Sequence, residues 1–253
     1  HTFIDTQIIA ESPDEYFWAG IGDAFSKGPE VELSSREVEL LHSPLMGRAL
    51  AAGACIEPLF DNAEQALADK RAGVVSEAFE NVVLNIIVTA GIVSNMTTNL
   101  GAERGAYYFN SSTAHAFYNA FTALGERGEK HLHGEVVSFG TCVLYAFDGN
   151  LKALEEQVAL NRKLGLPTTL ANLDITSESV DADLDIIVER AQKTNEWGRA
   201  PYGFTPDRFR QAILDTDAYG RAVASGEKDQ ETAALDVIAA HAPSAETAVP
   251  RKM

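Results

Sequence analysis

Hydrophobic spacing of helical period runs through almost the whole chain after Ser12, and this pattern constrains the fold class most strongly. Residues 73 to 95 are the clearest case, with apolar side chains recurring on one face of a 3.6-residue helix. These side chains are Val75, Phe79, Val82, Val83, Ile86, Ile87 and Ala90. The turn-separated strand pairs of an all-β domain are missing. The sequence therefore predicts an all-α domain, with residues 73 to 95 as a core helix.

Capping signals place the helix starts. Ser12-Pro13-Asp14-Glu15 combines an N-cap serine, a first-turn proline and an S-x-x-E capping box, so a helix is predicted from residue 13. The same signal at residues 34 to 37 predicts a helical segment to about residue 70, which Pro44 and Pro58 must break or kink. Further helices are predicted over residues 112 to 124, 135 to 147, 151 to 164, 179 to 195 and 206 to 223.

The remaining segments are predicted to lie outside the helical core. Residues 1 to 11 carry a short apolar run that favours a strand, and a lone strand belongs to an absent neighbour or forms an extended arm. Residues 96 to 111 are polar and glycine-containing, which is typical of a loop. Residues 225 to 253 are rich in Ala, Glu and Asp, and we expect an exposed helix followed by a frayed tail.

Composition excludes several classes of partner. A chain of 253 residues with 45% hydrophobic content can bury a substantial core, while a net charge of −17 repels phosphate backbones and anionic lipid. We therefore expect no nucleic acid and no membrane partner, and no run of about 18 uninterrupted apolar residues or basic leader suggests a span or export. Cys55 and Cys142 lie in apolar helical stretches, which favours buried thiols in the cytoplasm.

Two of the six histidines are candidates for a metal site. His115 opens one predicted helix and His133 precedes the next, so a helical hairpin brings both to one edge. A helix N-terminus disfavours protonated imidazole, and we expect His115 to be neutral and able to bind metal. Two unrelated structural histidines are the alternative. Three others have no acidic or histidine neighbour at ligand spacing, namely His1, His42 and His241.

Asp23 is the best candidate for a carboxylate ligand. It follows Gly20 and Gly22 inside a predicted helix, where each glycine costs about 1 kcal/mol relative to alanine, so a close backbone approach is expected there. The alternative is a helix kink with Asp23 as an exposed cap. A dinucleotide-binding G-x-G-x-x-G motif is excluded, because Phe25 occupies the third glycine position and a helix precedes the motif.

Six motifs, in this order, resemble the C-terminal domain of the glycerol dehydrogenase family, within the iron-type alcohol dehydrogenase superfamily. They are Ile8-Ile9-Ala10-Glu11-Ser12-Pro13, Gly20-Ile21-Gly22-Asp23-Ala24, Ala114-His115-Ala116 with Asn119 and Thr122, His133-Gly134-Glu135, Gly165-Leu166-Pro167-Thr168-Thr169-Leu170 and Asp217-Ala218-Tyr219-Gly220. The resemblance runs from residue 1 to about 223. It implies a multi-helix domain of the dehydroquinate synthase-like fold over residues 12 to 224, with Asp23, His115 and His133 as metal ligands.

The resemblance also implies cofactors, partners and an enzyme built from two domains. Iron-using members carry a histidine four residues after the aspartate, where this chain has Lys27, so three ligands with an open position favour Zn²⁺ over iron. NAD is implied for the intact enzyme, together with a polyol or alcohol substrate and a homo-oligomer. The family's N-terminal nucleotide-binding domain is absent from the sequence. Residues 1 to 11 are then a residual strand of that domain, and the chain alone is not expected to be active.

Two other functions remain open from the sequence. A hydroxycarboxylate or oxo-acid reductase on the same fold would be favoured by a basic residue facing the open metal position. A non-catalytic helical metal-binding or assembly module is the alternative of another class. His131 is either a proton relay or a surface histidine with satisfied hydrogen bonds, and Glu135 is expected to complement the first turn of its helix. Neither is included in the catalytic set.

Overall fold

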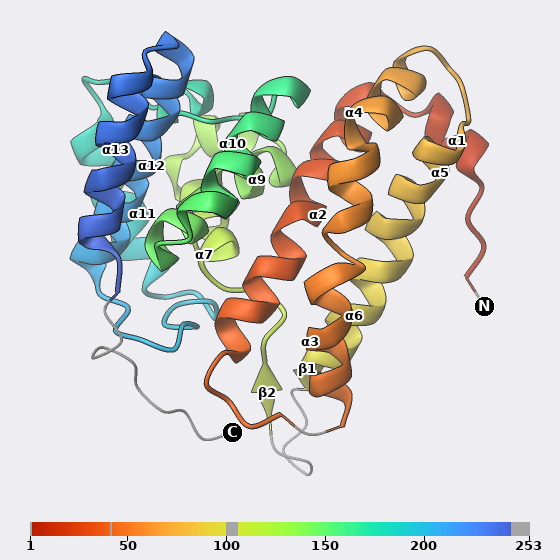
Figure 1. Cartoon of the computed structure of the whole chain (residues 1–253), viewed down its shortest axis with the longest axis horizontal. Helices are drawn as coiled ribbons and strands as arrows, with labels where there is room; N and C mark the ends of the chain where they lie inside the picture. The colour runs from red at the N-terminus through yellow and green to blue at the C-terminus, as the bar shows by residue number, and fades with distance from the viewer. Residues whose placement is uncertain (1, 41, 100–105, 244–253) are drawn as a thin grey trace.

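The computed structural model describes residues 2–40, 42–99 and 106–243, and within them the chain is almost entirely helical (Figure 1). The first half forms α1 (Thr6–Glu11), α2 (Asp14–Ser35), α3 (Ser43–Gly53), α4 (Glu57–Arg71), α5 (Glu77–Leu84), the π-helical η1 (Asn85–Thr89) and α6 (Ala90–Thr97). The second half forms α7 (Thr113–Phe121), η3 (Thr122–Leu124), α8 (Glu126–Lys130), α9 (His133–Asp148), α10 (Leu151–Leu164), η4 (Leu170–Leu173), α11 (Val180–Ala191), α12 (Pro206–Ser225) and α13 (Lys228–His241). The predicted all-α fold class is confirmed.

The long helix α2 lies between two groups of helices (Figure 1). On one side, Phe17, Ile21 and Phe25 of α2 join a hydrophobic core with side chains of α4, α5 and α10. On the other side, a larger core is built around α9 and includes the fully buried Phe139 and, from α7, Phe117. Because α2 touches helices of both groups, residues along its length can meet residues from either half of the chain.

The strand predicted within residues 1 to 11 is wrong. Residues 6 to 11 form α1, because the side chain of Asp5 caps this helix by accepting hydrogen bonds from the backbone N–H groups of Gln7 and Ile8. The apolar spacing of Ile4, Ile8 and Ile9 suits one face of a short helix as well as a strand. Ile4 and Ile9 pack against the core beside α2.

The helix start predicted at residues 34 to 37 is also wrong, because α2 continues to Ser35 and Ser34 and Ser35 lie in its last turn. Ser35 Oγ donates to the carbonyl of Val31 at 2.6 Å, a local bond that competes with capping. At the start of α2, Ser12 Oγ donates to Ile9 O at 2.7 Å instead of forming the predicted capping box. Serine supports a helix start and a helix end through similar short-range bonds, so sequence spacing alone did not separate them.

Proline and threonine signals located other boundaries correctly. Pro44 and Pro58 lie in the first turns of α3 and α4, so the predicted breaks are confirmed. Thr205 caps α12 by accepting from Arg208 N at 3.3 Å. The expected helix after residue 225 is α13, which buries Ile238 against the larger core. Residues 244–253, predicted as a frayed tail, lie outside the described part of the chain.

The predicted loop over residues 96 to 111 contains a short antiparallel pairing. Strand β1 (Thr98–Asn99) pairs with β2 (Tyr107–Tyr108), with Thr98 opposite Tyr108. Phe109 N then donates to Thr97 O at 2.9 Å, which extends the contact to the end of α6. This pairing places the chain that leads into α7 beside the C-terminal half of α2, where Ser34 Oγ donates to Phe109 O.

The amphipathic segment predicted as a core helix is only partly buried. Phe79, Val82 and Val83 are buried as expected, whereas Ile87 is 42% exposed. Residues Glu77–Thr97 form a continuous helix through α5, η1 and α6, and by length and composition it could cross a membrane, with mean hydropathy 1.4 and 28% burial. It is the one such helix in the described residues, and a helix of a soluble core can pass the same test.

Candidate metal centre

A glycine contact between α2 and α9 sets the geometry of the site. A β-carbon on Gly22 of α2 would lie 2.4 Å from the carbonyl oxygen of Gly134 in α9, a separation that no larger residue tolerates. Asp23 follows Gly22 and His133 precedes Gly134, so the contact brings these two side chains together. The close approach expected at Gly22 is therefore present, and its cause is the backbone of another helix. Gly20 has no such constraint, since its nearest neighbour is the Ile86 side chain at 3.5 Å.

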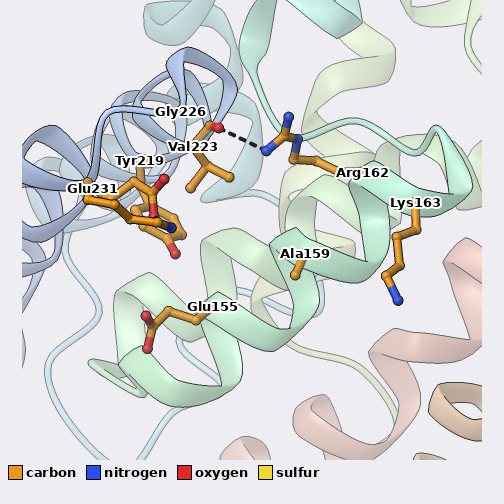
Figure 2. A pocket seen from close by; sticks show the side chains of 9 residues that line it. Glu155, Ala159, Arg162, Lys163, Tyr219, Val223, Gly226 and Glu231 are labelled. Atoms are coloured by element: carbon orange, nitrogen blue, oxygen red, sulfur yellow. Dashed lines mark hydrogen bonds and ion pairs between the residues drawn. The ribbon is translucent and has the colours of Figure 1, made fainter.

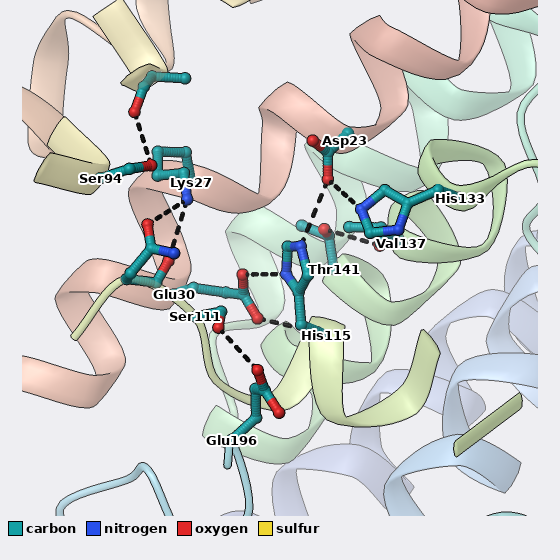
Figure 3. A network of polar contacts seen from close by, with 12 residues as sticks. Asp23, Lys27, Glu30, Ser94, Ser111, His115, His133, Val137, Thr141 and Glu196 are labelled. Atoms are coloured by element: carbon teal, nitrogen blue, oxygen red, sulfur yellow. Dashed lines mark hydrogen bonds and ion pairs between the residues drawn. The ribbon is translucent and has the colours of Figure 1, made fainter. Parts of the chain in front are cut away.

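The three residues predicted as ligands meet at one point (Figure 3). Asp23 Oδ1 lies 3.0 Å from His133 Nε2 and 3.5 Å from His115 Nε2. Their ligand atoms all lie within 4.8 Å of one another. Neighbouring ligand atoms on a tetrahedral zinc ion are about 3.3 Å apart, given bonds of about 2.0–2.2 Å. The donor set and its spacing thus fit a divalent metal with three protein ligands.

Each ligand candidate is held by its own surroundings. The ring of Tyr118 in α7 packs edge-on against His133, with centroids 4.1 Å apart. His115 lies in the first turn of α7, and its Nδ1 lies 2.6 Å from Oε2 of Glu30. Asp23 is anchored to the middle of α2 and is partly exposed, as is His133. The site therefore has one buried side, toward Glu30, and one side open to solvent.

Glu30 is a further residue of the site, absent from the predicted set although its spacing from Asp23 in the sequence points to it. Glu30 lies seven residues after Asp23, which is two helical turns, so both carboxylates lie on the same face of α2. Its side chain is completely buried. Burying an acid is costly unless a hydrogen-bond donor or a positive charge lies nearby. A Glu on the same face of an apolar helix as Asp23 therefore indicates that a donor from elsewhere in the chain contacts it. The donor is His115, 85 residues away.

The expectation that the helix N-terminus keeps His115 neutral is opposed in the structure by two nearby carboxylates. Burial lowers the pKa of His115, but the negative charge of Glu30 and the hydrogen bond to Asp23 outweigh it and raise the pKa to about 10. Burial raises the pKa of Asp23, and hydrogen bonds from His115 and His133 hold this pKa below its usual range. The helix N-terminus effect is smaller than these two direct contacts. The three groups form a charge-compensated cluster in which a cation can replace the imidazolium proton.

The two neighbouring residues left out of the catalytic set have local partners. Glu135 Oε2 accepts from Leu132 N at 3.1 Å in the first turn of α9, as predicted for a residue that complements its helix. His131 Nδ1 lies 2.9 Å from Glu135 Oε1, and its Nε2 lies 3.3 Å from Asp174 Oδ2. Both ring nitrogens are therefore engaged away from Asp23. This favours the satisfied-histidine interpretation over a proton relay.

Lys27 stands one helical turn after Asp23, where iron-using relatives were expected to carry a histidine. Its side chain is buried, and Nζ donates to the side-chain and backbone oxygens of Asn110 at 2.7 and 3.1 Å. The ammonium thus ties α2 to the segment that leads into α7 (Figure 3). An ammonium group is not a metal ligand while protonated, so the set stays at three.

Two of the histidines that are not predicted to bind the metal are His1 and His241. His241 has no acidic or histidine neighbour at ligand spacing in the sequence, but its Nδ1 lies 2.7 Å from Asp215 Oδ2, because α13 folds back on α12. Within the described residues, no third ligand group joins this histidine–aspartate pair. His1 lies outside the described residues.

The molecule also has a cavity of about 670 Å³ between α10, α12 and α13 (Figure 2). Its cations are already engaged, since Arg162 donates to Val223 O at 2.8 Å and Lys228 pairs with Glu231 at 2.6 Å. None of its lining residues belongs to the metal centre. The cavity therefore contributes nothing to the chemistry of Asp23 and the two histidines.

Comparison with known proteins shows that the chain is similar in sequence to several dehydrogenases. No family model matches the sequence. The chain is 33% identical over 223 residues to a glycerol dehydrogenase of Escherichia coli, covering 86% of this chain and 57% of that protein. It is 29% identical over 217 residues to hydroxycarboxylate dehydrogenase A of Escherichia coli, covering 85% and 57%. The chain thus spans about 57% of the length of these curated relatives.

Solved structures give the same result for the fold. A probable glycerol dehydrogenase from Sinorhizobium meliloti matches with a TM-score of 0.74 and 28% identity, covering 86% of this chain and 59% of that one. Glycerol dehydrogenase from Schizosaccharomyces pombe matches with a TM-score of 0.74 and 28% identity, covering 89% and 56%. The helical arrangement around α2 and α9 is therefore that of the helical domain in these proteins.

Proposed function

Since this chain is related by sequence and by fold to the helical domain of the glycerol dehydrogenases, in the iron-type alcohol dehydrogenase superfamily, we propose that it is the metal-bearing part of an NAD-linked polyol dehydrogenase. Asp23, His115 and His133 are the proposed ligands. The observation that carries the proposal is the convergence of these three side chains from α2, α7 and α9. A bound divalent metal supplies Lewis acidity toward a substrate oxygen.

The chain's own residues would contribute position and charge. Asp23 supplies a negative charge that favours a cation, and the Gly22–Gly134 contact fixes His133 beside it. The side chains of Asp23 and His133 are 43% and 45% exposed, so a small alcohol could approach them from solvent. NAD contacts would involve the part of the relatives' length that this chain does not span, so we propose turnover only for the complete enzyme.

We propose zinc as the metal. Three ligands from one carboxylate and two imidazoles, with an open position, are typical of catalytic zinc sites. Lys27 supports this choice, because its ammonium is held by Asn110 and adds no fourth ligand. The same contact favours a polyol over a hydroxycarboxylate substrate, since a free basic group beside the metal would be needed to pair with a carboxylate.

The proposal is tested by metal content and then by turnover. We expect one zinc per chain in the wild type and loss of bound zinc in Asp23→Ala and in His133→Ala. His241→Ala is a matched control, because it removes another imidazole paired with an aspartate and should leave zinc content unchanged. Full zinc occupancy in both ligand variants contradicts the site.

Substrate class is tested in the complete enzyme, by NADH formation with glycerol and 1,2-propanediol and by NADH oxidation with a 2-oxo acid. Turnover of the diols supports the polyol assignment, and turnover of the oxo acid alone supports the reductase alternative. Zinc binding without NAD binding or turnover in the complete enzyme would identify a non-catalytic metal-binding module.

We also propose that copies of the chain associate in the cytoplasm through the exposed apolar face of residues Glu77–Thr97. Leu84, Ile87, Val88 and Ile92 are 36–43% exposed there, and residues 81 to 97 contain no ionisable group. An uncharged contact face keeps like charges out of direct contact, which lessens the mutual repulsion of chains with net charge −17. Light scattering should give a mass above 27.3 kDa, reduced by Ile92→Lys. A wild-type mass of one chain contradicts this assembly.

A further inference from the structure

Both oxygens of the buried Glu30 carboxylate contact the start of α7, at Ser112 and His115. Oε1 accepts hydrogen bonds from the backbone N–H groups of Ser112 and His115 at 2.8 and 2.9 Å. Oε2 lies 2.6 Å from His115 Nδ1. Glu30 therefore binds His115 twice, through its backbone and through its ring, while Asp23 faces the other ring nitrogen (Figure 3).

We infer that Glu30 is a positioning residue of the proposed metal centre, holding His115 so that Nε2 is directed toward Asp23. This inference rests on the proposed function, because it assigns Glu30 a role in metal binding. Glu30 is not itself a proposed metal ligand, and it would act on the metal through its contacts with His115. With Nδ1–H donating to Oε2, the proton that a metal would displace from the ring is the one on Nε2, whose lone pair then becomes the ligand.

Glu30 Oε1 accepts backbone hydrogen bonds at the start of α7, but this capping role does not by itself explain why a charged side chain is buried there. The N-cap residue of α7, Ser112, makes no side-chain capping bond, and its Oγ has no hydrogen-bond partner among the described residues. A serine hydroxyl at an N-cap can satisfy the first backbone donors of a helix by itself. Burying a carboxylate is costly unless hydrogen bonds or nearby positive charge compensate it, and the ring of His115 contributes a contact of 2.6 Å to Oε2. The second oxygen therefore serves the imidazole.

The arrangement also explains why α2 carries both groups. Asp23 and Glu30 are two turns apart on one helix, which continues through Pro29, so helix geometry places both carboxylates on the same face. His115 spans the gap between them, with Nδ1 toward Glu30 and Nε2 toward Asp23. The helix α2 thus carries the proposed ligand Asp23 itself and holds a second proposed ligand, His115, through the hydrogen bond to Glu30.

Glu30→Gln separates this role from capping. The two backbone N–H donors of Ser112 and His115 hold the amide oxygen of a glutamine in the place of Oε1. Its NH₂ group then faces His115 Nδ1, which must act as an acceptor and carry its proton on Nε2. We expect helix content to be retained and zinc affinity, measured by chelator competition, to fall about 10- to 100-fold.

Glu196→Gln is the matched control. Glu196 is another buried acid that accepts hydrogen bonds, in this case from the hydroxyls of Tyr108 and Ser111, and it lies outside the metal centre. Its substitution should leave zinc affinity within about twofold of the wild type. Equal zinc affinity in wild type and Glu30→Gln overturns the inference while the metal site stands. A wild type that binds no zinc overturns the proposed function itself.

A measurement on the zinc-loaded wild type keeps the inference testable if Glu30→Gln does not fold. In ¹⁵N NMR spectra of the histidine rings, His115 should carry its proton on Nδ1 and bind zinc through Nε2. Ligation through Nδ1, or an unprotonated Nδ1, would contradict the role of Glu30.

Discussion

A β-carbon placed on Gly134 would lie 1.8 Å from the carbonyl oxygen of Ala19 and 2.9 Å from the backbone nitrogen of Asp23. The obstructing atoms are backbone atoms within α2, so no side-chain rotation can relieve the overlap. Gly134 therefore lets α9 approach α2 closely enough for His133 and Asp23 to share a site. A glycine next to a proposed ligand is here a requirement of helix packing.

Gly134→Ala should weaken both packing and metal binding. Separating α2 from α9 to accept the methyl group should lower the free energy of unfolding by about 1–3 kcal/mol, the usual range for overpacking. Zinc affinity should also fall, because His133 moves with the first turn of α9. Denaturant unfolding and chelator competition measure the two effects.

Gly91→Ala is the corresponding control, since Gly91 is also helical but has open space around its position. We expect a gain of about 0.5–1 kcal/mol from reduced freedom of the unfolded chain. Zinc affinity should not change. If Gly91→Ala lowered stability and zinc affinity as much as Gly134→Ala does, the effect would come from replacing any helical glycine and not from the α2–α9 contact.

Arg127 and Asp183 give a pH-dependent contribution to stability. Hydrogen bonds from the Arg127 guanidinium to both oxygens of Asp183, at 2.5 and 2.6 Å, hold the pKa of this carboxyl below its usual range. The stabilisation is therefore present above about pH 4, the unfolded pKa, and is lost as the pH falls through the folded pKa.

Asp183→Asn should accordingly cost about 1–2 kcal/mol near pH 7, an amount limited by the partial exposure of Arg127. The cost should shrink at pH 3, below the unfolded pKa, because the unfolded chain binds a proton there more readily than the folded wild-type carboxyl does. Urea unfolding at both pH values provides the measurement. A cost that is the same at both would show that the charge of Asp183 makes no contribution.

The two cysteines should be unreactive in the folded protein. Both thiols are free and buried, and burial raises the pKa of Cys55 to about 11 and the pKa of Cys142 still further. Since the thiolate is the reactive form, alkylation by iodoacetamide near pH 7 should be slow until urea unfolds the chain. Rapid labelling under native conditions would contradict the burial of these residues.

Lys70 joins the N-terminal segment to α4. Its buried Nζ donates to Ala10 O at 2.9 Å and to Ser12 O at 2.5 Å, and it pairs with Asp14. Lys70→Met keeps much of the side-chain volume but removes these donors, and we expect faster hydrogen exchange in α1 and about 1–3 kcal/mol lower stability. Unchanged exchange in α1 would mean that apolar packing of Ile4 and Ile9 is sufficient to hold it.

Some features of the fold follow from short stretches of sequence. Prolines at the first turns of α3, α4 and α12 mark helix starts through a fixed φ and a missing N–H group, so their effect needs no distant partner. The N-terminal helix was missed because six residues of mixed apolar pattern suit a helix or a strand, and the capping bond of Asp5 decides between them. The end of α2 was missed because Ser34 and Ser35 bond backward to Val31.

For the metal centre, the sequence determined which residue types are present and which helices carry them. Asp23, His115 and His133 were found from local spacing and family resemblance, since each lies at a helix position that sequence pattern can locate. Only the tertiary structure decided what lies opposite each of them. Glu30, Gly134 and the raised pKa of His115 depend on contacts between residues far apart in the chain, and such contacts exist only after α2, α7 and α9 have packed together.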